Sequence, residues 1–288
     1  MTLTLVLGLL VAARSEPSAP PLALVRFTCD ERVAARRAER AWRAPAVVDE
    51  LARGWSVDVR DACEHAEEFE RLVGERGVLA ACALDARGTV VGVLRGPAPA
   101  EQCVEFLDRC RDEARRAHEA RSEDDTLARL DARIALGAWS AARAELDVLD
   151  CADERAARLS ERRARLHALQ GDVRRAEHAL AASRATGFGD DARASRRADV
   201  TAALIALAAR RLDAVRALLP IVLADVEDAP CERDALVRIA QALHESGADE
   251  LALDVAAALE AARPTTGVLR ALDALREHVA RGPVGHAH

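Results

Sequence analysis

The sequence predicts a chain in two parts, a small α/β sandwich with a mixed sheet followed by an all-α helical array. Three observations predict this fold class. Between residues 21 and 117, short apolar runs alternate with helix-period patterns. From residue 125 to residue 279 strand signals are missing and helical patterns follow one another in pairs. The 288 residues are enough to bury a core in each part.

The expected divisions follow from these patterns. They are a leader at 1–20, the α/β domain at 21–117, a charged linker at 118–124, helical repeats with a cap helix at 125–279, and a flexible tail at 280–288.

The first part begins with the apolar run "PLALVRF", which predicts a strand over residues 21–27. The next stretch, "DERVAARRAERA", predicts a helix capped by Asp30. A second strand is expected at "WSVDV", residues 55–59, and a second helix at "EHAEEFERLVG", which ends at Gly74.

The rest of the first part reads as a hairpin and a helix. The runs "GVLAACAL" and "TVVGVLRG" are too uniformly apolar for a half-exposed sheet, and "DARG" between them suits a tight turn. A helix then begins with Pro99 in its first turn. Its positions Cys103, Phe106, Leu107 and Cys110 share one face, which predicts that both cysteines are core residues.

The second part shows a helix-turn-helix period. Gly137 and Gly171 each lie between two helical patterns and are 34 residues apart, and Gly247 marks a later copy. A small residue follows each glycine five positions on, as Ala142, Ala176 and Ala252. A 34-residue period of this kind is typical of a stacked solenoid, in which no unit buries its apolar face alone. The stretch "TTGVLRALDALREHV", residues 265–279, is expected to cap it.

The composition excludes several classes of partner. The formal charge is −7 with acidic and basic residues interspersed, and only 2% of the residues are aromatic. No basic stripe or stacking platform for nucleic acid is therefore expected. No apolar run is long enough for a transmembrane segment. Glycine-rich phosphate loops and Cys/His ligand sets are also missing from the sequence, so we expect no cofactor and no metal.

The quoted elements of residues 21–117 resemble, in order and spacing, a thioredoxin-like domain. The resemblance is strongest in "VGERGVLAACALDARGTVVGVLRG". Such domains carry a C-x-x-C motif at the start of the first helix, a loop proline and a buried acid. The resemblance places Arg32 and Ala35 at the two cysteine positions, Leu79 at the proline and Arg26 at the acid. Dithiol exchange needs an attacking thiolate and a second thiol to resolve the mixed disulfide, so a redox-inactive domain is expected.

Two other cysteines keep a thiol mechanism open as the alternative. Cys29 lies three residues before the first family cysteine position and is either a relocated thiol or a packing residue at the strand end. Cys63 stands where a strand leads toward a helix, whose dipole favours a thiolate, while the adjacent Asp61 and Glu64 oppose it.

The helical repeats are similar to tetratricopeptide units, which bind peptides or partner proteins. The pairing of such repeats with a thioredoxin-like domain resembles the bacterial chaperedoxin co-chaperones in architecture. The function expected is a non-enzymatic, redox-inactive module that binds a protein or peptide through its repeats, as a co-chaperone or scaffold. An odd count of seven cysteines favours the cytoplasm. Residues 1–13, "MTLTLVLGLLVAA", resemble a secretory signal, so a periplasmic or secreted protein is the alternative.

Overall fold

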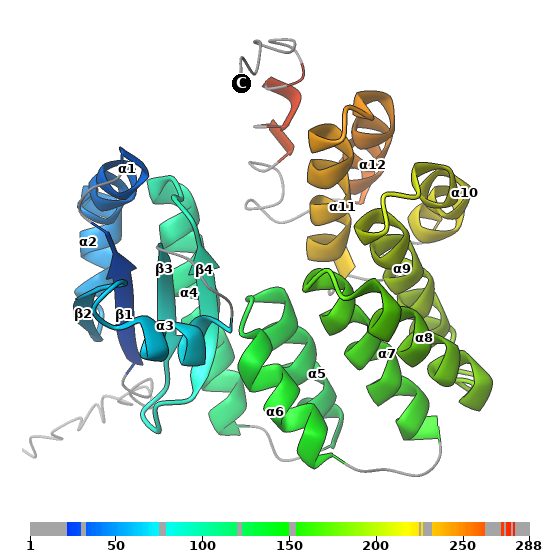
Figure 1. Cartoon of the computed structure of the whole chain (residues 1–288), viewed down its shortest axis with the longest axis horizontal. Coiled ribbons are helices and arrows are strands. Elements are labelled where there is room, and N and C mark those ends of the chain that lie inside the picture. Colours follow the sequence, from blue (N-terminus) through cyan, green and yellow to red (C-terminus); the bar gives the residue numbers. More distant parts are fainter. Residues whose placement is uncertain are drawn as a thin grey trace, which may run out of the picture.

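The computed structural model (Figure 1) shows an α/β part followed by helical hairpins. The residues it describes are 22–29, 33–74, 79–119, 123–149, 154–224, 226, 232–262, 272, 273, 275–277 and 279. The expected leader at 1–20, the Asp30 cap, Arg32 and the tail at 280–288 lie outside these residues.

The described strands form a four-stranded mixed sheet in the order β2-β1-β3-β4. β1 is parallel to β2, with Thr28 opposite Asp61, and antiparallel to β3, which forms a hairpin with β4. Their bounds are β1 Leu22–Thr28, β2 Trp55–Asp61, β3 Ala80–Leu84 and β4 Val90–Arg95. The predicted strands and hairpin are therefore confirmed, and β2 and β4 lie at the two edges of the sheet.

Four helices belong to this part: α1 Val33–Trp42, α2 Pro45–Leu51, α3 Ala66–Val73 and α4 Ala100–Glu119. α2 was not predicted; it has only seven residues and begins with Pro45, which is compatible with the first turn of a helix. α3 ends at Gly74, with φ of 81°, as expected. Pro99 immediately precedes α4 and accepts its first hydrogen bond, from Cys103 N, at 3.1 Å.

The helices cover the sheet on both faces. On one face α1, α2 and α4 enclose a core that includes Leu24, Trp42, Val47 and Leu107. On the other face α3 packs with its Phe69, whose ring meets that of Phe27 edge-on at 5.0 Å. The predicted core positions on α4 are all buried, including both cysteines.

The second part of the described chain consists of four helical hairpins, α5/α6, α7/α8, α9/α10 and α11/α12 (Figure 1). Their bounds are α5 Glu123–Ala135, α6 Trp139–Val148, α7 Glu154–Leu169, α8 Val173–Thr186, α9 Ala192–Ala208, α10 Leu212–Leu223, α11 Arg233–Glu245 and α12 Asp249–Ala261. α4 and α5 take up residues 118, 119, 123 and 124 of the expected linker. The described part of the expected cap contributes Leu272 and Leu275 to the core of the last hairpins.

The four hairpin turns have the same backbone geometry. In each, one residue has a positive φ, its N–H donates to the carbonyl three residues earlier, and the next N–H donates to the carbonyl five residues earlier, with N···O distances of 2.8–3.2 Å. The residues with positive φ are Gly137, Gly171, Arg210 and Gly247. Five positions after each stands a fully buried residue, namely Ala142, Ala176, Val215 and Ala252. The turn geometry therefore repeats even where the sequence has lost the glycine.

The first hairpin packs against the outer edge of the sheet. Val93 N, on β4, donates to Leu136 O in the α5/α6 turn at 2.8 Å. Arg95 donates to Gly137 O at 2.9 Å and to Val73 O at 2.6 Å, and its guanidinium lies 4.1 Å from the centroid of the Trp139 ring. Leu136 belongs to one core of the α/β part and Ala138 to the other. Edge strand β4 is thus covered by helices from the second part.

Candidate functional site

The position that the resemblance assigns to a buried acid holds Arg26, on β1, which is one of the two inner strands. Arg26 is 7% exposed and forms an ion pair with Glu39 of α1. Its guanidinium carbon also lies 5.0 Å from the centroid of the Trp42 ring. A buried charge is stable only with an ion-pair or cation–π partner, and both partners of Arg26 are on α1. Arg26 therefore links α1 to the sheet.

The two other described positions of this region also lack a reactive group. Ala35 is buried in α1, and Leu79 accepts a hydrogen bond from Gly96 N through its carbonyl at 3.0 Å. The cavity between Arg26, Trp42 and Leu79 has a volume of about 10 Å³. That is room for about one water molecule and not for a peptide side chain. Arg32 lies outside the described residues.

The two cysteines of the alternative hypothesis lie near the same end of the sheet. Cys29 is half-buried and directly follows β1, and Ala62 N donates to Thr28 O at 2.8 Å, which places the turn at 62–65 beside that strand end. Cys63 is exposed in this turn, and Asp61 Oδ1 accepts hydrogen bonds from the N–H groups of Cys63 and Glu64. α3 begins three residues after Cys63, so this thiol precedes the helix and is not part of its first turn.

The cysteines within the sheet and α4 are shielded from solvent. Burial raises the pKa of the Cys82 thiol to about 12 and that of Cys103 to about 11, and it raises the pKa of Cys110 further still. Thiols in this state are poor nucleophiles at neutral pH. They are packing residues, as predicted for Cys103 and Cys110.

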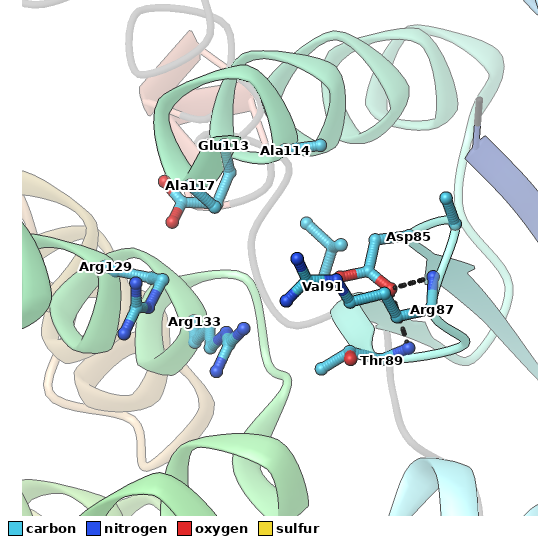
Figure 2. Close-up of a pocket in the computed structure, with 10 residues that line it drawn as sticks. Asp85, Arg87, Thr89, Val91, Glu113, Ala114, Ala117, Arg129 and Arg133 are labelled. Atoms are coloured by element: carbon cyan, nitrogen blue, oxygen red, sulfur yellow. Dashed lines mark hydrogen bonds between the residues drawn. The ribbon is translucent and has the colours of Figure 1, made fainter. Parts of the chain in front are cut away.

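A cavity with a polar lining, called the junction cavity here, lies where the α/β part meets the first hairpin (Figure 2). Its volume is about 480 Å³, and it is bounded by the β3–β4 turn, the C-terminal half of α4, and α5. Its polar lining consists of Asp85, Arg87, Thr89, Glu113, Arg129 and Arg133, and its apolar lining of Ala86, Val91, Ala114 and Ala117.

Glu113 is the unusual group of this junction cavity. It is 3% exposed, its Oε1 has no hydrogen-bond partner, and the nearest guanidinium, that of Arg116, is 3.9 Å from Oε2. Burial raises the pKa of its carboxyl to about 7, although Arg116, Arg133 and Arg129 act in the opposite direction. Glu113 therefore titrates near neutral pH.

The two arginines of α5 are held by one carboxylate. Glu145, on α6, accepts hydrogen bonds from both Arg129 and Arg133. These bonds use Arg129 Nε and Nη2 and Arg133 Nη1, which leaves Arg129 Nη1 and Arg133 Nε and Nη2 without a hydrogen bond to a described residue. Arg87, on the β3–β4 turn, is exposed and makes no ion pair within the described parts of the chain.

Charged residues also lie along the first helix of each hairpin, namely α5, α7, α9 and α11. The side chains described next are buried or half-buried and have polar partners. Arg162 is 1% exposed and donates to Asp131 of α5 at 2.5 Å, and Thr201 of α9 donates to Glu161 of α7. Arg238 of α11 donates to Ala135 O, 103 positions earlier in the chain. The hairpins therefore follow a path that brings the fourth back to the first.

Glu113, Arg129 and Arg133 were not among the residues predicted from the sequence. One signal was present, because Glu113 continues the apolar stripe of α4 that includes Phe106 and Cys110, at helical spacing. A carboxylate on a buried stripe marks either a strong partner or an unusual environment. The two arginines carried no signal in a sequence in which every basic residue apart from histidine is arginine.

Within the described residues, no group of His, Cys, Asp and Glu has a geometry suited to a metal ion. No described helix combines the length and the apolar character needed to cross a bilayer. Comparison with protein-family models, curated proteins and solved structures gives no match for this chain.

Proposed function

We propose that this protein is a redox-inactive, non-enzymatic module that binds other proteins, as a co-chaperone or scaffold. The α/β part would be a thioredoxin-like domain without its dithiol, and the hairpins would be tetratricopeptide-like repeats. Support for the loss of redox function comes from the Arg26 region, where Ala35 and Leu79 carry no reactive group and the cavity is nearly closed.

The observation that carries protein binding is the open edge at β2. Ser56, Val57, Asp58 and Val59 are all exposed, and the two valines are 44% and 52% exposed. Proteins usually protect such an edge with charges, prolines or a covering element. Among the described residues nothing pairs with the outer side of β2. An extended apolar segment of a partner can add to such an edge through backbone hydrogen bonds.

The hairpin array is the second surface for a partner. The ion pairs Arg162–Asp131 and Arg196–Glu232 along its first helices are largely buried, so they hold neighbouring hairpins together. Partners would therefore meet the exposed outer positions of the helices, among which Val148 and Ile221 are large apolar residues with high exposure.

The edge is tested by the ability of the full chain to keep heat-unfolding citrate synthase from aggregating, followed by light scattering. The wild-type chain should suppress scattering in proportion to its concentration. The double variant Val57→Lys/Val59→Lys should suppress it more weakly, because the two charges oppose strand addition. Val48→Lys, at a position on α2 that is 50% exposed, is the matched control and should behave as wild type. Scattering unchanged by a fivefold excess of wild type would contradict the proposal.

The contribution of the array is tested with a chain that ends at Leu149. This end point keeps α5 and α6, because Leu136 and Ala138 belong to the cores of the α/β part. Removal of residues 125–279 would instead expose β4 as an uncovered edge strand, which is prone to aggregation. We expect circular dichroism to show that the chain ending at Leu149 remains folded. We also expect this shortened chain to capture much less partner protein than the full chain. Undiminished capture would exclude the array as a binding surface.

The alternative function is a thiol–disulfide protein that acts through Cys29 or Cys63. The observation in its favour is that the half-buried thiol at the end of β1 and the exposed thiol in the next turn lie near one end of the sheet. The variants Cys29→Ser and Cys63→Ser separate the two functions, since only a thiol protein needs those sulfur atoms.

A further inference from the structure

We propose that the junction cavity binds a small organic acid, whose carboxylate is held between Arg87 on the β3–β4 turn and Arg129 and Arg133 on α5. This inference goes beyond protein binding, because it places a small-molecule site between the α/β part and the first hairpin. Binding sites are common at junctions of this kind, and about 480 Å³ is within the range of small-molecule sites.

The wall of the junction cavity includes a buried polar atom without a hydrogen-bond partner. Glu113 Oε1 is shielded from solvent and makes no hydrogen bond. An unsatisfied buried acceptor is unfavourable, so a bound group that donates a hydrogen bond to Glu113 removes that penalty. Figure 2 shows Glu113 on α4, with the side chains of Arg129 and Arg133 on one side of the cavity and Asp85, Arg87 and Thr89 on the other.

The charges favour an anion over a cation. Arg87, Arg129 and Arg133 are offset by Asp85 and Glu145, which leaves a net charge of +1 when Glu113 is neutral and 0 when it is ionised. Each of the three guanidinium groups has N–H donors that are not used by described residues, and guanidinium groups match the planar geometry of a carboxylate.

The rest of the lining favours an organic acid over inorganic phosphate. Val91, Ala114 and Ala117 offer apolar contact for a carbon skeleton, and Thr89 offers a hydroxyl. Inorganic phosphate has no carbon skeleton to make these apolar contacts, whereas an organic acid has one.

Protonation of Glu113 is coupled to binding. The groups that face it are Arg116 on its own helix, Arg129 and Arg133 on α5, and Glu145 behind them on α6. Ionisation of Glu113 adds a negative charge beside the bound carboxylate, so affinity falls as the pH rises through the pKa of about 7. If only the protonated form binds, the loss between pH 6 and pH 8 is about tenfold.

The test is isothermal titration of the full-length protein with succinate, glutamate and citrate at pH 6 and pH 8, with inorganic phosphate and agmatine as comparison probes. We expect at least one of the acids to bind with millimolar affinity or better, and more tightly at pH 6. Glu113→Gln should remove the pH dependence, because its side chain stays neutral. Arg87→Ala should weaken binding about tenfold or more, since one charge-assisted pair is lost. Arg115→Ala, an exposed position on α4 outside the lining, should leave it unchanged.

Three results would overturn the proposal: no heat from any of the three acids at 20 mM, equal binding of phosphate, or preferential binding of the cation agmatine. Arg87 is exposed, so its removal leaves the fold intact, and a thermal scan of each variant checks this. The titration does not depend on the aggregation assay. A negative titration would therefore contradict only the small-molecule site, and a negative aggregation assay would contradict only the proposed protein binding.

Discussion

At the scale of single residues, Arg210 shows that the third hairpin turn is maintained at a cost. Its φ of 55° makes it the one described residue other than glycine with positive φ. The left-handed conformation costs an L-residue with a side chain about 1–2 kcal/mol. Glycine occupies the equivalent place in the other three turns. The surrounding helices therefore determine this turn, and Arg210 adapts to it.

Arg210→Gly is expected to raise the free energy of unfolding by about 1 kcal/mol, because glycine adopts the left-handed region without strain. Urea unfolding followed by circular dichroism measures the change. Arg210→Ala keeps the strain but removes the exposed side chain, so it should differ little from wild type. Equal stabilisation by both variants would show that the side chain, and not the backbone, is responsible.

The buried residues also show what sequence reasoning can reach at this scale. Cys103 and Cys110 were predicted as core residues because periodicity on one helix is a local property. The environment of Glu113 was not predicted, because it depends on α5 and on the β3–β4 turn, which the chain brings together only in the folded state. Local patterns report which face is buried, but they do not report what that face meets.

At the scale of elements, the junction between β4 and the α5/α6 turn joins the two parts. Gly137 provides the positive φ of the turn, and a Cβ at this position would lie 2.7 Å from Val93 O. At Gly171 and Gly247 a Cβ would meet nothing within 4 Å. Gly137 therefore has two roles, backbone conformation and close approach to the strand, while the other two have only the first.

This difference predicts unequal effects of the same substitution. Gly171→Ala should lower the free energy of unfolding by about 1 kcal/mol, the cost of the left-handed conformation alone. Gly137→Ala should cost clearly more, because the added methyl group also forces the hairpin away from β4 and weakens the bond from Val93 N to Leu136 O. Thermal unfolding of the two variants side by side is the measurement. Equal losses would mean that the first hairpin does not depend on this contact.

The order of elements could be predicted almost completely, since it rests on local patterns: strands, the β3–β4 hairpin, α3 with its Gly74 end, and the glycine turns. α2 was missed because seven residues give too short a window for a helical period. The α5/α6 hairpin was assigned to the array, while its turn also completes both cores of the α/β part. Such long-range packing leaves no periodic signal in the sequence.

At the scale of the whole molecule, the two parts share a core and differ in exposed surface. The edge at β4 is closed by the first hairpin, and the edge at β2 is exposed over Ser56–Val59. The ion pairs Arg162–Asp131 and Arg196–Glu232 join neighbouring hairpins and hold them in a fixed arrangement. The array and the open strand therefore lie at opposite edges of the sheet, and under the proposed function they would give two separate surfaces for a partner protein.

The most direct test of the central claim is the precipitation of insulin in the presence of dithiothreitol at neutral pH, followed by turbidity. A thiol–disulfide catalyst brings forward the onset of turbidity, and a module that holds unfolded chains delays it. We expect a delay that grows with protein concentration and is the same for the wild type, Cys29→Ser and Cys63→Ser. An earlier onset with the wild type that either serine variant abolishes would contradict it.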